Sequence, residues 1–218
     1  GTGKGTVTGA GKGIVMRGWV FAVCAALGLS GCTAAEVWAP DEAVAKASYQ
    51  HDGPPRLTLY TMINNRTGAG AHSSLMVNAS ERVIFDPAGS FKHETLPERN
   101  DVVYGITPQV EDVYTRYHAR KTYHVQIQRL DVSPELAERA IQLVKANGPV
   151  PSAQCSLATS RILGELFPGQ IRTSWFPRKT AEDFGKIPGV TEEKLYEYDG
   201  DDNSNVLAAW DPARAKAQ

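Results

Sequence analysis

The stretch "RLTLYTMINNRTGAGAHSSLMVNASERVIFD" (residues 56–86) indicates three short strands in succession. Apolar and polar side chains alternate along 56–65, as they do in a strand with one buried face. The segments 72–77 and 82–86 are rich in apolar residues, and the intervening "NASE" suits a turn, which predicts a hairpin. Strands joined by connections this short pair in antiparallel fashion, so we expect an antiparallel sheet.

The sequence after the hairpin indicates helices and one further strand. A Thr-Pro start predicts a short helix over 107–120, and alternation over 121–132 predicts a strand. A helix is expected over 133–148, which begins with Ser-Pro and ends with Asn-Gly. We expect Ser152 to cap the next helix, which places Cys155 at its third position. This order predicts an α+β domain, with helices packed on one side of a small antiparallel sheet.

The N-terminal segment carries targeting features. Residues 1–15 are rich in glycine and precede the first methionine, so we interpret them as a non-native or mis-assigned leader. Residues 16–31 have one arginine before a short apolar run, as in a signal peptide, and the run is too short to span a bilayer. They lead into "LSGC", which resembles the bacterial lipobox. The resemblance implies cleavage before Cys32, acylation of its thiol and membrane attachment through the acyl chains. Because Thr33 follows, it also implies the periplasmic face of the outer membrane.

The composition limits the number of domains and the kinds of partner. A chain of 218 residues, 42% of them hydrophobic, is suited to a single domain. We expect that catalytic-type domain over 56–210, after a tether over 32–55 and before a frayed tail over 211–218. The net charge is −1, and removal of the three basic residues in 1–31 makes it −4. No basic patch stands out, so nucleic acid is not an expected partner. The cysteines and histidines have no zinc-site spacing, and we expect no metal or cofactor.

Cys155 is the residue most suggestive of chemistry. Cleavage would remove Cys24 and acylation would consume Cys32, which leaves Cys155 as a lone thiol in an oxidising compartment. A thiol near a helix N-terminus has a lowered pKa, because the unpaired N–H groups favour the thiolate. We therefore interpret Cys155 as a nucleophile. The alternative is a small buried apolar residue, a common role for unpaired cysteine.

A thiolate nucleophile is served by a histidine base, and the base by a residue that orients it. The five candidate bases are His51, His72, His93, His118 and His124. We favour His72, because it opens a strand directly after a glycine-rich loop and has room to reach a cleft. His118 reads most simply as a solvated helix-end residue, and His124 as an edge or half-buried strand residue.

Asp86 is the candidate orienting residue. An odd-numbered hairpin loop such as 78–80 would place it directly opposite His72 on the same face of the sheet. A four-residue loop would instead place Ser73 opposite Asp86. The other interpretation is a turn residue, because Asp86 stands before Pro87 in "DPAG".

The order of these residues resembles a known superfamily. A strand-borne histidine in "GAHSSLMV", a polar residue at the far end of the paired strand, and a later cysteine in "AQCSLATSRIL" are similar to circularly permuted NlpC/P60 (papain-like) proteins. The similarity covers 56–167. Gln154 stands where an Asn often precedes the cysteine, which leaves the substrate class open. The resemblance implies a small antiparallel sheet carrying the cysteine helix, and hydrolysis or transfer at an acyl carbon.

Taken together, these features predict a lipid-anchored envelope cysteine hydrolase of the amidase or peptidase type. Its catalytic residues would be Cys155, His72 and Asp86, and its expected substrate a cell-wall (peptidoglycan) peptide. Two alternatives remain. One is an acyl-lipid hydrolase or acyltransferase of the same fold, and the other is a non-catalytic lipoprotein that binds an envelope partner.

Overall fold

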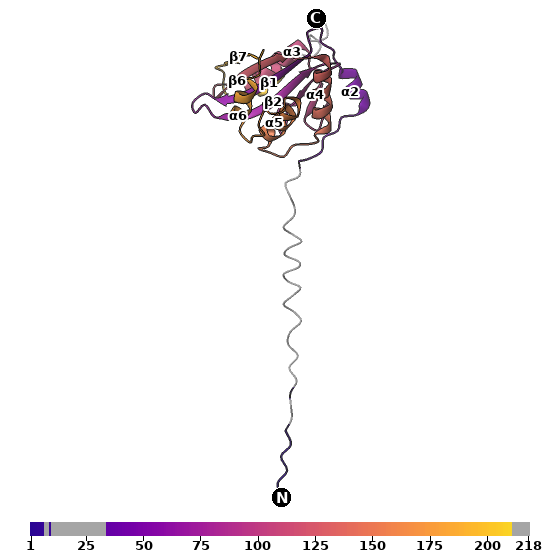
Figure 1. The fold of residues 1–218 in the computed structure, drawn as a ribbon, viewed down its shortest axis with the longest axis vertical. Helices are drawn as coiled ribbons and strands as arrows, with labels where there is room; N and C mark the ends of the chain where they lie inside the picture. The colour runs from indigo at the N-terminus through magenta and orange to yellow at the C-terminus, as the bar shows by residue number, and fades with distance from the viewer. Residues whose placement is uncertain (7–8, 10–33, 211–218) are drawn as a thin grey trace. The chain divides into compact units, whose positions relative to one another are not determined.

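The computed structural model describes residues 1–6, 9 and 34–210 (Figure 1). The expected signal peptide over 16–31, the lipidation site Cys32 and the tail over 211–218 lie outside the described residues, as does most of the leader. The chain divides into two compact units, Gly1–Thr33 and Ala34–Gln218, and the second contains all the helices and strands described below.

The second unit is built on a seven-stranded sheet in the order β4-β5-β3-β2-β1-β6-β7, with every neighbouring pair antiparallel. The strands are β1 (Arg56–Asn64), β2 (Gly70–Asn78), β3 (Arg82–Phe85), β4 (Glu98–Arg99), β5 (Val102–Tyr104), β6 (Tyr123–Asp131) and β7 (Thr191–Leu195). The predicted antiparallel sheet and α+β class are thus confirmed. The sequence analysis missed β5 because the strand is short and buried throughout, so it shows no alternation.

Six helices accompany this sheet in the described part of the chain. They are α2 (Asp41–Ala47), α3 (Pro108–His118), α4 (Pro134–Ala146), α5 (Cys155–Leu166), α6 (Pro177–Phe184) and α7 (Ser204–Ala209). As predicted, the side chains of Thr107 and Ser133 cap α3 and α4. No helix among the described residues is long and apolar enough to cross a bilayer.

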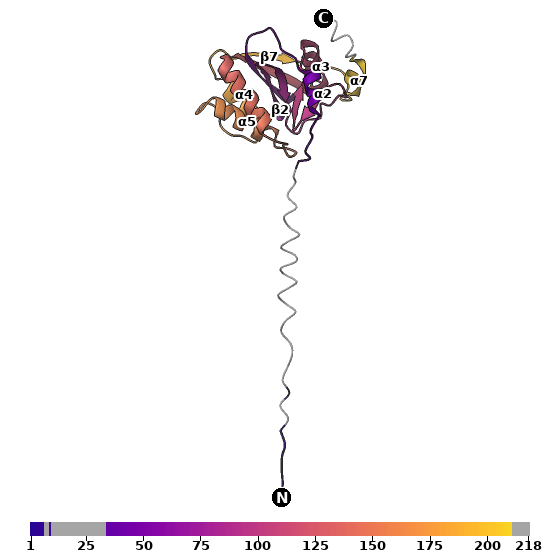
Figure 2. The same ribbon diagram turned by 90° about the vertical axis from the view of Figure 1, so that its right-hand side faces the viewer.

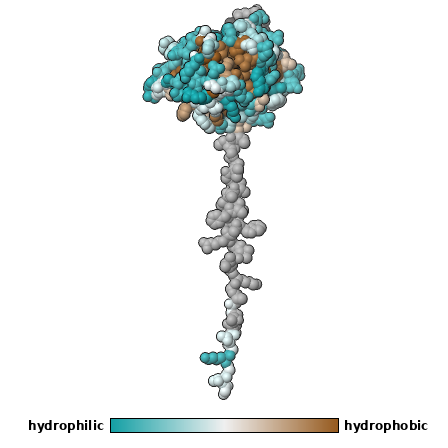
Figure 3. Space-filling view, in the orientation of Figure 1, coloured by the Kyte–Doolittle hydropathy of each residue, from teal (hydrophilic) through white to brown (hydrophobic). Residues whose placement is uncertain are grey.

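Helices cover both faces of the sheet, so the expectation of one-sided packing was wrong. Helices α4, α5 and α6 contribute to one apolar core, and α3 contributes to a second core on the opposite face (Figure 2). Strand β1 explains the difference, because Leu57 and Leu59 enter the first core while Tyr60 and Met62 enter the second. The outer surface seen in Figure 3 is mainly hydrophilic around a smaller hydrophobic area.

The expected tether over 32–55 is in part a packed segment of the domain. Asn100 donates its backbone N–H to the Val37 carbonyl at 2.9 Å, and Trp38 forms an isolated bridge with Arg99. Val44 of α2 packs against the first apolar core. The folded domain therefore begins before β1.

Helix α5 begins later than the sequence indicates. Ser152 lies in a turn rather than at the cap, and Ala153 adopts a left-handed conformation with φ of 64°. Gln154 becomes the N-cap residue and makes no side-chain capping bond. Cys155 is therefore the first helical residue rather than the third, where its backbone N–H has no intrahelical acceptor.

Candidate active site

The β2–β3 hairpin brings His72 and Asp86 to the same face of the sheet. Asn78 pairs with Arg82 and Leu75 with Phe85, so the connecting loop has an odd number of residues. Continuing this register places Ser74, rather than His72, opposite Asp86. The expected direct pairing of His72 with Asp86 was therefore wrong by two residues. Because the loop is odd, the two side chains still lie on the same face of the sheet, as diagonal neighbours that long side chains can bridge.

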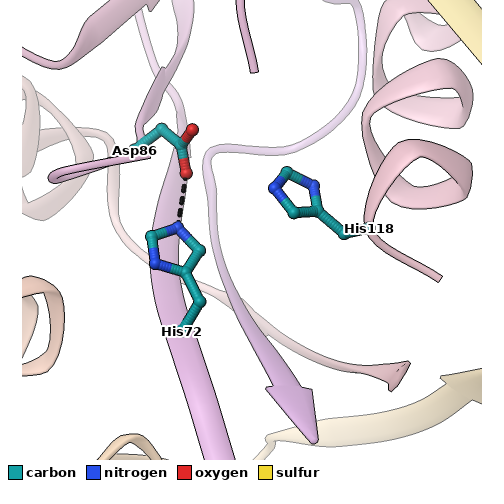
Figure 4. Close-up of side chains that lie close together, drawn as sticks. All are labelled: His72, Asp86 and His118. Atoms are coloured by element: carbon teal, nitrogen blue, oxygen red, sulfur yellow. Dashed lines mark hydrogen bonds and ion pairs between the residues drawn. The ribbon is translucent and has the colours of Figure 1, made fainter. Parts of the chain in front are cut away.

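A hydrogen bond joins the side chains of His72 and Asp86 across this diagonal. His72 Nε2 lies 2.7 Å from Asp86 Oδ1, and the two side chains point toward each other (Figure 4). Nε2 is therefore the donor, since an ionised carboxylate only accepts. This leaves Nδ1 as the ring nitrogen available to a second partner.

Asp86 is fixed by its backbone as well as by its side chain. Its N–H donates to the Asp101 carbonyl at 2.8 Å, and its own carbonyl accepts from the Gly89 N–H at 2.9 Å. Asp86 thus begins the turn that its sequence context predicted, while its carboxylate contacts His72. Both interpretations of Asp86 therefore apply: its backbone forms the turn, and its side chain orients His72.

Tyr114 of α3 supports the carboxylate from the second core. Its hydroxyl oxygen lies 2.8 Å from Asp86 Oδ1 and 2.6 Å from Ser74 Oγ. A phenol has one proton and the carboxylate only accepts, so Tyr114 donates to Asp86 and accepts from Ser74. Asp86 is buried, and the hydrogen bonds from Tyr114 and His72 compensate for the loss of water around its charge.

Cys155 lies where β2 has an unpaired edge. Strand β3 ends opposite Leu75, so the preceding residues of β2 have no strand on that side, and the N-terminus of α5 fills the space. The backbone N–H groups of Ser73 and Ser156 and the imidazole of His72 interact with the sulfur. The structure therefore brings together the three residues selected from the sequence: Cys155, His72 and Asp86.

The charges of these three groups are coupled. Burial disfavours charge on His72, but Asp86 and Cys155 outweigh it and raise the pKa of the imidazole to about 10. Burial also opposes the thiolate, yet His72 and the nearby N–H groups lower the pKa of Cys155. Burial opposes the Asp86 carboxylate, and His72 nevertheless lowers its pKa. His72 and Asp86 thus favour each other's charged forms, and His72 favours the thiolate form of Cys155.

His118 is a site residue that the sequence analysis placed wrongly. It is half-buried rather than solvated, and its ring stacks on His72 with centroids 5.9 Å apart (Figure 4). Its Nδ1 donates to the Tyr114 carbonyl at 2.9 Å, which leaves Nε2 as an acceptor. Burial lowers the pKa of His118 to about 4, so the ring is neutral at pH 7. Tyr114 and His118 are four residues apart and therefore lie on one face of α3. This spacing indicates a site role for His118 only once Tyr114 is known to face the site.

A cavity of about 270 Å³ lies beside the two stacked rings. His72, His118, Gly89 and Tyr123 are among its lining residues. It provides space next to the imidazole pair for part of a small molecule or for water.

The same rings and Asp86 are the natural place to consider a metal ion. His72, Asp86 and His118 offer ligand atoms within 4.8 Å of one another. Asp86 already accepts hydrogen bonds from His72 and Tyr114, so the arrangement matches a hydrogen-bonded relay better than a metal centre.

The remaining histidines interact elsewhere. His51 lies 3.2 Å from the Tyr49 hydroxyl, and His93 lies 2.8 Å from Thr95 Oγ1. His124 is buried on β6, which lies between β1 and β7, so the expectation of an edge or half-buried residue was wrong; its Nδ1 lies 2.7 Å from Asn65 Oδ1.

No protein-family model, curated protein or solved structure matches this chain.

Proposed function

We propose that this protein is a cysteine hydrolase that acts at an acyl carbon, with Cys155 as nucleophile, His72 as acid and base, and Asp86 as the residue that orients His72. The observation that carries the proposal is the 2.7 Å hydrogen bond between His72 and Asp86, beside a Cys155 thiol whose pKa His72 lowers. His72 Nε2 is held by Asp86, which leaves Nδ1 to serve the nucleophile, as in a catalytic imidazole. The order of these residues along the chain also fits the permuted NlpC/P60 resemblance.

The geometry supports a two-step reaction. The Cys155 thiolate attacks the carbonyl carbon and forms a carbon–sulfur bond, while the carbonyl electron pair moves to oxygen. The backbone N–H of Cys155 is suited to stabilise that oxyanion because it has no intrahelical acceptor. When the intermediate collapses, His72 Nδ1 gives its proton to the leaving group, and an acyl-thioester remains.

Hydrolysis of the acyl-thioester reverses the roles. Neutral His72 takes a proton from water, and the resulting hydroxide attacks the acyl carbon. The carbon–sulfur bond breaks, a carboxylic acid leaves, and the thiolate and imidazolium are restored. An acceptor other than water in this step would make the protein an acyltransferase.

The expected address in the bacterial envelope favours cell-wall peptides as the acyl donor, with lipid acyl groups as the alternative. The experiment incubates the purified chain with peptidoglycan and separately with phospholipid vesicles, and measures the carboxylate or amine released. We expect Cys155→Ala and His72→Gln to abolish release. The matched control is His124→Gln, which changes a buried histidine of the same sheet outside the site. Equal release by wild type and Cys155→Ala on every substrate would overturn the proposal in favour of a binding protein.

A further inference from the structure

Two adjacent aromatic side chains project into solvent before α6. Trp175 is 56% exposed and Phe176 is 69% exposed. The other large exposed apolar residues, within the described part of the chain, are Trp38, Tyr196 and Tyr198. Exposing a neighbouring Trp–Phe pair costs hydrophobic free energy unless a partner covers it.

The backbone holds this pair outward. Ser160 Oγ of α5 accepts the Ser174 N–H at 2.9 Å, and Ser174 Oγ accepts the Phe176 N–H at 3.1 Å. Pro177 then starts α6 directly after the pair. The aromatic side chains are thus presented by a segment anchored on both sides rather than by a loose loop.

Basic residues flank the aromatic pair. The segment "RTSWFPRK" (172–179) contains three basic residues and no acidic one, in a chain whose net charge is −1. Arg178 and Lys179 reach Glu182 at 3.5 and 2.9 Å, but these ion pairs are exposed and contribute little. Arg172 is paired with Asp183 at 2.9 Å, and Arg178 also donates to the Gly68 carbonyl at 3.0 Å. The cations that face solvent are therefore Arg178 and Lys179, whose side chains are more than half exposed.

This segment borders the proposed active site. A Cβ atom on Gly70 would lie 2.8 Å from the backbone nitrogen of Arg178. The start of α6 therefore packs against β2 at a position two residues before His72. Thr180 Oγ1 lies 2.8 Å from Oγ of Ser156, the residue after Cys155. Whatever covers the aromatic pair therefore lies near the nucleophile.

We propose that segment 172–179 docks on the surface of an anionic lipid bilayer. Trp175 and Phe176 enter the interface between headgroups and acyl chains, and Arg178 and Lys179 bind lipid phosphates. Aromatic rings with basic neighbours suit this boundary, since one part is apolar and the other is hydrated. If the proposed function holds, docking brings the Cys155 thiol to the membrane surface and favours lipid acyl groups, the alternative donor named above, over cell-wall peptides.

The test uses the complete chain bound to vesicles of brominated phosphatidylglycerol, whose bromine atoms quench nearby tryptophan fluorescence. The contribution of Trp175 is the difference in quenching between wild type and Trp175→Phe. We expect this difference to be large with brominated phosphatidylglycerol and small with brominated phosphatidylcholine. Trp38→Phe is the matched control, because Trp38 is 60% exposed but lies outside the segment.

Two further variants test the charge and the insertion. We expect Arg178→Ser with Lys179→Ser to raise the anionic lipid needed for half-maximal Trp175 quenching roughly thirtyfold, since each of the two cations near the surface contributes about 1 kcal/mol. Phe176→Ser should weaken the quenching without a change in lipid charge preference. Equal quenching of Trp38 and Trp175, or a Trp175 response to isolated cell wall but not to vesicles, would overturn the proposal. Repeating the measurement in Cys155→Ser separates docking from catalysis, because docking does not require the thiol.

Discussion

His72 and Asp86 are joined by a 2.7 Å hydrogen bond across a diagonal of the β2–β3 hairpin. The buried Asp86 carboxylate raises the pKa of the His72 imidazole and so stabilises positive charge on the ring. The bond therefore links an orienting role to an electrostatic one. Both roles have consequences that are measurable before any substrate is known.

Asp86→Asn should change how stability depends on pH. The pKa of His72 is raised from 6.5 to about 10, so its charge stabilises the fold fully below pH 6.5 and progressively less as pH rises toward 10. Asparagine removes the carboxylate charge, so this pH-dependent contribution should shrink. The measurement is the free energy of urea unfolding between pH 6 and 10, in a Cys155→Ala background that removes the titrating thiol. Asp131→Asn, at an exposed ion pair with Arg56, should keep the pH profile.

The Cys155 thiol should react at a pH where an ordinary cysteine is protonated. His72 and the neighbouring N–H groups lower the pKa of Cys155 despite its burial, so at a given acidic pH a larger fraction of it is thiolate than of an ordinary cysteine. We expect the rate constant for alkylation by iodoacetamide at pH 6 to fall at least about tenfold in His72→Gln. His124→Gln should react as wild type does. Identical rates for His72→Gln and wild type would remove the basis for a thiolate–imidazolium pair.

Gly89→Ala should displace the Asp86 carboxylate. A Cβ atom on Gly89 would lie 1.8 Å from Asp86 Oδ2, far inside contact distance. The carboxylate must then move, although it is held by His72 and Tyr114. We expect a stability loss of about 1–3 kcal/mol, as in other overpacked sites, together with slower alkylation of Cys155 at pH 6.

Gly200→Ala is the control for the substitution at Gly89. A Cβ atom on Gly200 would meet nothing within 4 Å, so stability and alkylation should match wild type. A Gly89→Ala protein with unchanged alkylation at pH 6 would show that the Asp86 position does not govern the thiol.

The sequence predicted the local elements better than their packing. Alternation in the sequence located β1 and β6, although the structure buries β1 on both faces. The start of α5 was misplaced because Ala153 adopts a left-handed conformation that alanine rarely takes. His118 was misplaced because its surroundings depend on which face of α3 packs against the sheet. Candidate site residues were thus identifiable by type and order, whereas the residues supporting them depend on tertiary packing.

Tyr114→Phe should separate support of the carboxylate from general stability. The change removes the donor at 2.8 Å from Asp86 Oδ1 and leaves the aromatic ring in the core. Loss of one buried hydrogen bond to a charged group costs about 1.5–3 kcal/mol, which urea unfolding measures. The matched control is Tyr60→Phe, since Tyr60 donates to Glu111 at 2.8 Å in the same core but does not contact Asp86. Both variants should lose stability, but only Tyr114→Phe should slow alkylation of Cys155 at pH 6. If both slow it equally, the effect is a loss of packing rather than of positioning.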